Sequence, residues 1–256
     1  MKHQLRYKDG NTLSYADYGD ENGFPILVQH GLVASIDDYG LFDCLIRAHA
    51  RLICIARPGY GGSSPYVLNS FAEWADLVSL IVDELKLTQF DLLGMSSGAP
   101  YSYSIGNRFP EKARNIYILS GIPALYDEIV LSEWPYKMAR NARLAEMQAL
   151  ARELFFSNVT DEDLKQPDVR DSLMNDCFGV AQDLRLRTLD WGFRLSDVKE
   201  KVFMRHSKCD DSVPFRTAVR TADLLPNCTI ELTETGPHFS SELLDHFMEK
   251  TIIPNI

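Results

Sequence analysis

The chain has 256 residues, 45% of them hydrophobic and 24% charged, which is globular composition and enough for one large core or a core plus an inserted subdomain. The formal net charge of -10 disfavours phosphate backbones and anionic lipid, so we expect neither nucleic-acid nor membrane partners. No apolar run approaches the roughly 20 residues that span a bilayer. The five cysteines form no C-x-x-C pattern and we see no apolar leader segment, so we expect free thiols and a cytoplasmic protein.

The expected elements alternate between strands and helices after an opening hairpin. Two alternating runs flank residues 8–11, which predicts a β-hairpin. Unbroken apolar runs then predict strands buried on both faces of a mainly parallel sheet, at 25–30, 51–56, 90–95, 115–121, 201–207 and 229–234. Helical spacing of apolar residues predicts helices at 38–48, 71–87, 98–108, 214–225 and 240–250. The pattern is typical of an open α/β sheet.

One long segment interrupts this alternation. Residues 125–195 contain no convincing strand, and several helical patterns occur in them, for instance at 133–156 and 168–193. About seventy residues is too long for a loop between two sheet strands. The segment is therefore predicted to be an inserted helical subdomain.

The stretch GMSSGAP, residues 94–100, has the pattern G-x-S-x-G between a predicted strand and a predicted helix. This is the context of a nucleophile elbow. Such a turn strains the backbone of its central residue, so the residues two before and two after it must lack bulky side chains. Centring the turn on Ser96 places glycine at both positions, whereas centring it on Ser97 places Met95 and Ala99 there. Ser96 is the predicted nucleophile; the other interpretation is a glycine turn with capping serines.

A serine nucleophile needs a general base, and the base needs an orienting acid. After an elbow of this kind the acid comes first along the chain and the histidine second. The strand expected at 201–207 is followed by KCDDSVP, and the strand expected at 229–234 is followed by TGPHF. Asp210 and His238 therefore follow the right strands in the right order.

Together these motifs resemble those of the α/β-hydrolase family, in its form with a serine nucleophile and a helical cap after the sixth strand. The matches are the H-G-x loop at 30–32, the R-P-G-x-G-x-S loop at 57–63, the elbow at 94–98, D-x-x-V-P at 210–214, G-x-H at 236–238 and, more weakly, 191–193. The chain departs from the family at Ala56, Lys201 and Ser207, where the family often has Asp, Pro and Gly. None of these departures removes a catalytic group, although the last can alter the shape of the acid loop.

The resemblance implies a mostly parallel sheet flanked by helices, with a core of residues 1–124 and 196–256 and a helical cap of residues 125–195. It implies that Ser96 attacks an acyl carbonyl, that His238 is the base and that Asp210 orients it. It also implies an oxyanion hole made by the backbone N–H groups of Leu32 and Ser97.

Asp211 is the rival for the acid, and the spacing to the following Val-Pro pair favours Asp210. A cap over the elbow is expected to act as a lid, so some of its aromatic side chains should line an apolar acyl site. Aromatic residues at helical spacing belong to a core more often than to a pocket. The residues predicted to bind substrate are Trp134, Tyr136, Phe178 and Trp191.

No cofactor or metal is expected. The glycine-rich stretch at 59–64 follows a strand, but the dinucleotide fingerprint G-x-G-x-x-G fails at Ser64 and no helix follows at once. His206 and Cys209 offer only two ligands, which is weak evidence for a metal.

The predicted activity is hydrolysis of a small, largely apolar carboxylic ester or related acyl compound through an acyl-enzyme. A serine nucleophile speaks against relatives that use aspartate. Two alternatives stay open: a carbon–carbon bond hydrolase that acts on diketone-like substrates with the same triad, and a low-turnover ligand-binding receptor on this fold.

Overall fold

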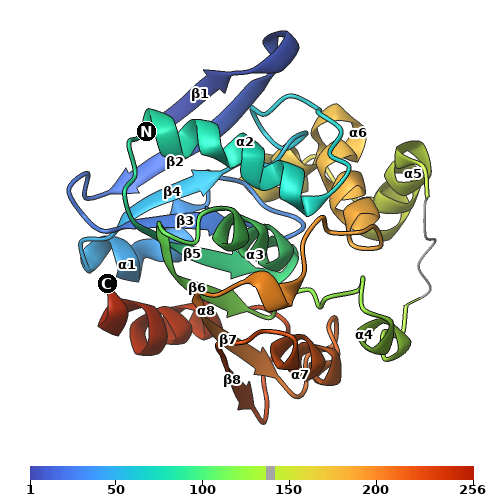
Figure 1. Ribbon diagram of the computed structural model, residues 1–256. Coiled ribbons are helices and arrows are strands. Elements are labelled where there is room, and N and C mark those ends of the chain that lie inside the picture. Colours follow the sequence, from blue (N-terminus) through green and yellow to red (C-terminus); the bar gives the residue numbers. More distant parts are fainter. Residues whose placement is uncertain (137–141) are drawn as a thin grey trace.

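The protein is built on one eight-stranded sheet. A computed structural model describes residues 1–136 and 142–256, and Figure 1 shows the sheet at the centre of the molecule. The strands are β1 (Lys2–Arg6), β2 (Thr12–Gly19), β3 (Pro25–Gln29), β4 (Arg51–Ile55), β5 (Phe90–Met95), β6 (Ala113–Leu119), β7 (Lys201–Ser207) and β8 (Cys228–Thr233). Every apolar run that predicted a strand forms one.

The strand order is β1-β2-β4-β3-β5-β6-β7-β8. Strands β1 and β2 form the predicted hairpin, whose turn places Asp9 and Gly10 at positive φ values of 55° and 77°. Strand β2 is also antiparallel to β4, and all neighbours from β4 to β8 are parallel. The predicted α/β sheet, mainly parallel after an opening hairpin, is confirmed.

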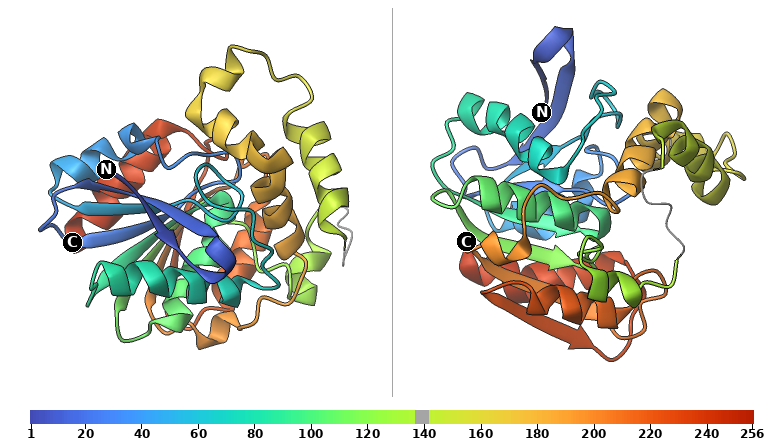
Figure 2. Two further views of the ribbon diagram at one scale, coloured as in Figure 1. Left: turned by 90° about the horizontal axis from the view of Figure 1, so that it is seen from above. Right: turned by 45° about the vertical axis from the view of Figure 1, so that its right-hand side comes forward.

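Helices cover both faces of the sheet (Figure 2). The core on one face includes α2 (Phe71–Glu84), α3 (Ala99–Arg108) and α7 (Phe215–Asp223), and the core on the other includes α1 (Asp43–Arg47) and α8 (Ser241–Phe247). Strand β3 has the expected period of two, because Leu27 packs into the first core whereas Ile26 and Val28 pack into the second. Helix α2 starts after Ser70, whose hydroxyl accepts a hydrogen bond from the Glu73 backbone N–H.

Between β6 and β7 the described residues form helices and no strand. The helices are α4 (Glu128–Ser132), α5 (Leu144–Phe155) and α6 (Pro167–Leu186), and α5 packs against α6 on the side of the molecule to which the parallel strands point (Figure 1). The helix expected over 133–156 begins only at Leu144, and residues 137–141 lie outside the described residues. The division into a core and a cap of residues 125–195 stays a prediction.

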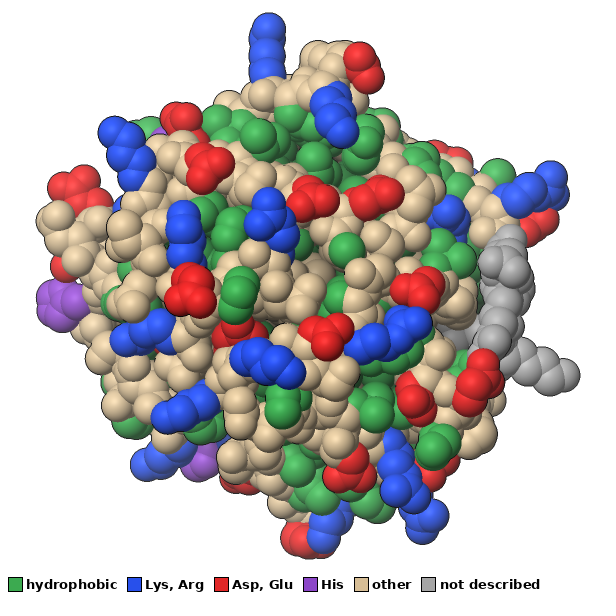
Figure 3. All heavy atoms as spheres, in the orientation of Figure 1, with side chains coloured by type: hydrophobic (Ala, Val, Ile, Leu, Met, Phe, Trp, Pro, Cys, Tyr) green, Lys and Arg blue, Asp and Glu red, His purple; other side chains and the backbone are tan. Residues whose placement is uncertain are grey.

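The surface carries charges of both signs. On the face in Figure 3, Lys and Arg side chains are interspersed with Asp and Glu side chains, and apolar side chains lie between them. All five cysteines are free. Within the described residues, no helix combines the length and the apolar character needed to cross a membrane.

Candidate active site

Four loops that are far apart in the sequence meet at the carboxyl ends of the parallel strands. They follow β3 at 30–36, β5 at the elbow, β7 at 208–214 and β8 at 234–239, and residues of all four line one cavity. In open α/β sheets this edge is where ligands bind, because the loops there come from several neighbouring strands.

The elbow holds Ser96 in a backbone conformation that residues other than glycine rarely adopt. Its φ is 48°, between the end of β5 and the start of α3. A Cβ atom on Gly94 would lie 2.5 Å from the Ser102 hydroxyl, and one on Gly98 would lie 2.0 Å from the Gln29 carbonyl oxygen. Only glycine permits these approaches, which agrees with the sequence argument for centring the turn on Ser96.

His238 connects the other two predicted catalytic residues. Its Nε2 lies 2.8 Å from Ser96 Oγ, and its Nδ1 lies 2.8 Å from Asp210 Oδ2. A carboxylate oxygen only accepts, so Nδ1 carries the proton and Nε2 is left to accept a hydrogen bond from the serine hydroxyl. The three side chains therefore form one hydrogen-bonded chain with the geometry that Ser-His-Asp chemistry requires.

Asp210, rather than Asp211, contacts the histidine. The side chain of Asp210 is fully buried, and its Oδ1 accepts hydrogen bonds from the backbone N–H groups of Ser212 and Val213 at 2.9 and 2.8 Å. Burial alone raises the pKa of the Asp210 carboxyl, but the hydrogen bonds from His238 and the two backbone groups outweigh it, so that pKa lies below its usual value. The side chain of Asp211 is exposed and accepts a hydrogen bond from the Ser212 hydroxyl.

A second histidine, which the sequence did not single out as part of the site, packs against the acid. His206 is buried in β7, its Nε2 donates to the Val213 carbonyl at 2.8 Å, and the same atom lies 3.3 Å from Asp210 Oδ2. Burial lowers the pKa of His206, so the ring is neutral and helps to fix the acid loop. The neighbouring Cys209 thiol donates to the Glu234 carbonyl.

Ser207, where the family often has glycine, links the acid loop to the histidine loop. Its hydroxyl donates to the Gly236 carbonyl at 2.7 Å and accepts a hydrogen bond from the Cys209 backbone N–H at 3.1 Å. The departure from the family pattern therefore leaves the acid in contact with His238 and adds a tie between the two loops.

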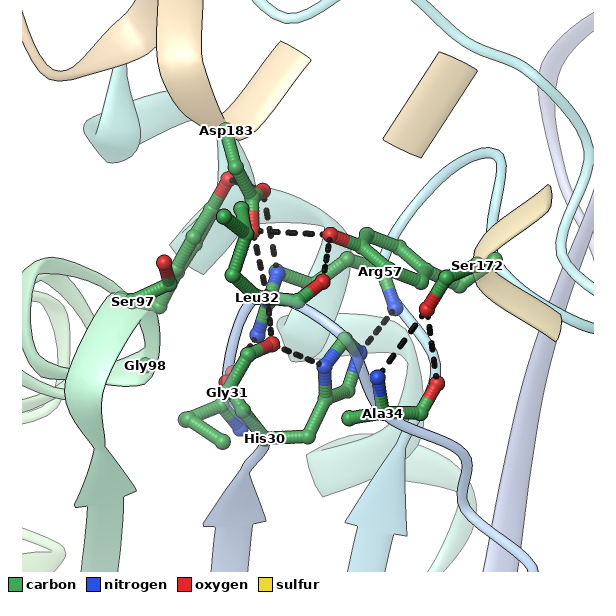
Figure 4. A network of polar contacts seen from close by, with 12 residues as sticks. His30, Gly31, Leu32, Ala34, Arg57, Ser97, Gly98, Ser172 and Asp183 are labelled. Atoms are coloured by element: carbon green, nitrogen blue, oxygen red, sulfur yellow. Dashed lines mark hydrogen bonds and ion pairs between the residues drawn. The ribbon is translucent and has the colours of Figure 1, made fainter. Parts of the chain in front are cut away.

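The loop after β3 is held by the buried side chain of Arg57 (Figure 4). Its guanidinium donates to the carbonyl oxygens of His30 and Gly31, each at 2.7 Å, and the Tyr60 hydroxyl donates to the Leu32 carbonyl at 2.7 Å. The Gly31 carbonyl and the Leu32 N–H belong to the same peptide, which is trans, so the two groups point in opposite directions. Because the carbonyl points toward Arg57, the Leu32 N–H is directed away from it. The oxyanion role of the Leu32 and Ser97 N–H groups stays a prediction.

Asp183 of α6 neutralises Arg57. The two side chains form a buried ion pair, with Arg57 Nη2 2.6 Å from Asp183 Oδ2, and the Tyr101 hydroxyl donates to Asp183 Oδ1 at 2.6 Å. Burial lowers the pKa of Arg57, but the carboxylate outweighs it and holds the pKa above its usual value. Sequence reasoning missed this network, whose only signal was the R-P-G pattern.

A cavity of about 1110 Å³ lies over the elbow. Ser96 and His238 lie on its lining, and so do Trp134 and Tyr136, whose contact with substrate stays a prediction. Most other lining side chains are apolar, and helices α5 and α6 contribute Met147, Leu150, Leu154 and Leu184. The site can therefore enclose a small organic molecule against the serine.

The prediction that Phe178 and Trp191 line this site is wrong. Phe178 packs on the loop after β4, so closely that a Cβ atom on Gly59 would lie 2.4 Å from its ring. Trp191 is fully buried between Phe71 and Tyr126, with ring centroids 5.1 and 4.9 Å apart. Helical spacing indicates which side chains are buried, but it does not distinguish a face that packs on the core from one that lines a cavity.

The family model described as alpha/beta hydrolase fold matches residues 25–241. The chain belongs to the alpha/beta hydrolase fold family. The matched residues include all strands from β3 to β8, the elbow, Asp210 and His238. The resemblance that the motifs predicted is therefore confirmed, together with the fold.

Several known proteins are similar to the chain. An esterase from Exiguobacterium antarcticum superposes with a TM-score of 0.77 at 20% identity over 98% of both chains. An uncharacterized hydrolase of Bacillus subtilis is 28% identical over 114 residues, which are 44% of this chain and only 39% of that protein. The 2-hydroxymuconate semialdehyde hydrolase of a Pseudomonas species is 21% identical over 235 residues, 85% of this chain and 81% of that protein.

Proposed function

We propose that this protein is a serine hydrolase that cleaves a small, largely apolar carboxylic ester or related acyl compound through an acyl-enzyme intermediate. The observation that supports this best is the hydrogen-bonded chain from Ser96 through His238 to Asp210. It opens onto a cavity with mainly apolar walls, which suits an acyl chain and offers few hydrogen-bond partners to a strongly polar substrate.

In the first step, Ser96 Oγ attacks the carbonyl carbon while His238 Nε2 takes the hydroxyl proton. Asp210 accepts a hydrogen bond from Nδ1–H and stabilises the imidazolium that forms. The carbonyl oxygen, now negatively charged, accepts hydrogen bonds from the backbone N–H groups of Leu32 and Ser97, each worth roughly 3–4 kcal/mol in the transition state.

In the second step, His238 gives its proton to the leaving alcohol and the acyl group stays on Ser96. A water molecule then attacks the acyl carbon while His238 Nε2 takes one of its protons. Collapse of this second tetrahedral intermediate releases a carboxylic acid and returns the proton to Ser96, so that the enzyme regains its starting state.

A second candidate is hydrolysis of a carbon–carbon bond by the same three residues. The similarity to a protein named 2-hydroxymuconate semialdehyde hydrolase, over 85% of this chain, favours keeping it. The similarity to the Exiguobacterium esterase, over 98% of the chain, favours the ester reaction.

The test is hydrolysis of para-nitrophenyl esters of increasing acyl length by the wild type, Ser96→Ala and the matched control Ser79→Ala, whose hydroxyl only donates to a carbonyl within α2. We expect the wild type and the control to hydrolyse short esters at equal rates and Ser96→Ala to lose at least about 10³-fold in kcat/KM. A wild type no faster than Ser96→Ala on every ester would refute the esterase proposal.

A further inference from the structure

Among the residues that the structure describes, no carboxylate forms an ion pair with Arg187, a buried arginine on the cavity lining. Arg187 follows the last residue of α6, is 8% exposed, and lies on the cavity lining together with Ser96. Its Nη2 donates to the Ser97 hydroxyl at 2.5 Å. Among the described residues its Nε is buried with no hydrogen-bond partner.

Asp183, the carboxylate that interacts electrostatically with Arg187, is occupied by other groups. Asp183 Oδ1 accepts from Arg57 Nε and from the Tyr101 hydroxyl, and Oδ2 accepts from Arg57 Nη2 and lies 3.1 Å from the Tyr60 hydroxyl. Asp183 therefore attracts Arg187 only through space, and burial lowers the pKa of Arg187 below its usual value.

An unpaired buried cation is costly for a folded protein, and such groups concentrate at sites that bind the opposite charge. We propose that Arg187 binds a carboxylate of the substrate, so that the natural substrate is a small ester, or related acyl compound, that carries one carboxylate on an otherwise apolar skeleton. This inference rests on the proposed hydrolase function and adds the substrate class to it.

The position of Arg187 limits the distance between the two functional groups of the substrate. The guanidinium of Arg187 contacts the Ser97 hydroxyl. Ser97 directly follows the nucleophile, and the Cα atoms of consecutive residues are about 3.8 Å apart. The carboxylate therefore lies within roughly 10 Å of the scissile carbonyl, a span that monoesters of short dicarboxylic acids can cover. The planar fork of arginine suits a carboxylate, which it can bind through two hydrogen bonds.

A carboxylate fits better than a phosphate because the cavity also contains acidic groups. Asp38 and Asp168 lie on its lining, each partly exposed, and burial and the neighbouring carboxylate raise the pKa of Asp38 to about 6. These groups repel a dianion more than a monoanion. Arg187 is more deeply buried than either of them, so water screens its attraction less.

The test compares mono-para-nitrophenyl glutarate with its methyl diester, which has the same skeleton without the charge. The proteins are the wild type, Arg187→Met and the control Arg185→Met, which removes the same charge from a residue of α6 that donates to the Leu68 carbonyl. Melting temperatures are measured for each, and Arg187→Gln replaces Arg187→Met if the latter does not fold.

We expect the wild type and Arg185→Met to have a kcat/KM at least tenfold higher for the acid than for the diester. Arg187→Met should lower kcat/KM for the acid on the order of 100-fold and change it for the diester less than about threefold. Equal use of the two esters by the wild type, or an equal loss for both in Arg187→Met, would overturn the carboxylate site and leave the hydrolase intact.

A binding measurement separates this inference from the proposed function. If neither ester is cleaved, the hydrolase proposal fails, and calorimetry on Ser96→Ala with monomethyl glutarate and dimethyl glutarate decides the site. The carboxylate site is supported if monomethyl glutarate binds at least tenfold more tightly than dimethyl glutarate and this preference is lost when Arg187→Met is added. Equal binding of the two compounds, or no binding, overturns it.

Discussion

Replacing Asp210 with asparagine should remove most of the activity by moving one proton. Oδ1 of Asp210 accepts hydrogen bonds from two backbone N–H groups, and Oδ2 faces His238 Nδ1. In the Asp210→Asn variant the amide oxygen must take the Oδ1 position, since only it can accept from those N–H groups, so the NH₂ group faces the ring. The ring then accepts at Nδ1, carries its proton on Nε2 and cannot take the proton of Ser96.

The loss expected from the wrong tautomer is about 10⁴-fold in kcat, or about 5 kcal/mol of transition-state stabilisation. The assay is release of para-nitrophenol from the best ester of the chain-length series. The matched control is Asp211→Asn, which removes the same charge one residue away from a side chain that is exposed, and it should keep kcat within about twofold. Activity of Asp210→Asn above one-tenth of the wild type, or a larger loss in Asp211→Asn, would refute this reasoning.

Three further predictions concern stability, measured by urea unfolding. Burial lowers the pKa of His206, so the neutral ring contributes to the free energy of unfolding above about pH 6.5, and this contribution is lost as the pH falls. Relative to His206→Gln, the wild type should lose up to about 1.4 kcal/mol of this free energy per pH unit between about pH 6.5 and 5.5. A difference between the two proteins that does not depend on pH would contradict this. A Cβ atom on Gly98 would lie 2.0 Å from a backbone carbonyl oxygen, so Gly98→Ala should lower the free energy of unfolding by more than about 3 kcal/mol. Gly40→Ala, which has open space at its Cβ, should lower it by less than about 1 kcal/mol. Similar losses for both variants would show that the elbow can relax. Asp183→Asn leaves the Arg57 guanidinium buried without its carboxylate and should lower the free energy of unfolding by about 3–5 kcal/mol. A loss below about 1 kcal/mol would show that water reaches the pair.

The sequence predicted the strands, the opening hairpin and the elbow because short-range rules determine them. Unbroken apolar runs mark strands buried on both faces, and the crowding of a tight turn distinguishes Ser96 from Ser97. The order of Asp210 and His238 along the chain followed from the strand order of this fold, and the structure brings both into contact with each other.

What the sequence did not predict depends on contacts between distant segments. The Arg57–Asp183 pair joins residues 126 positions apart, and Arg187 becomes significant only because Asp183 is already occupied. The prediction that Phe178 lines the substrate site was wrong for the same reason. The apolar pattern of a helix indicates that a side chain is buried, whereas packing between distant segments decides which side of the helix faces the cavity.

The most direct test of the central claim is labelling with a fluorophosphonate probe, followed by mass spectrometry of the labelled peptides. An activated serine next to a histidine base should form one covalent adduct per chain, on Ser96, and Ser96→Ala should not be labelled. Replacing His238 with alanine should slow the labelling strongly while leaving the site of the adduct unchanged. An adduct on a different residue, or labelling of Ser96→Ala to the same extent as the wild type, would contradict the assignment of Ser96 as the nucleophile.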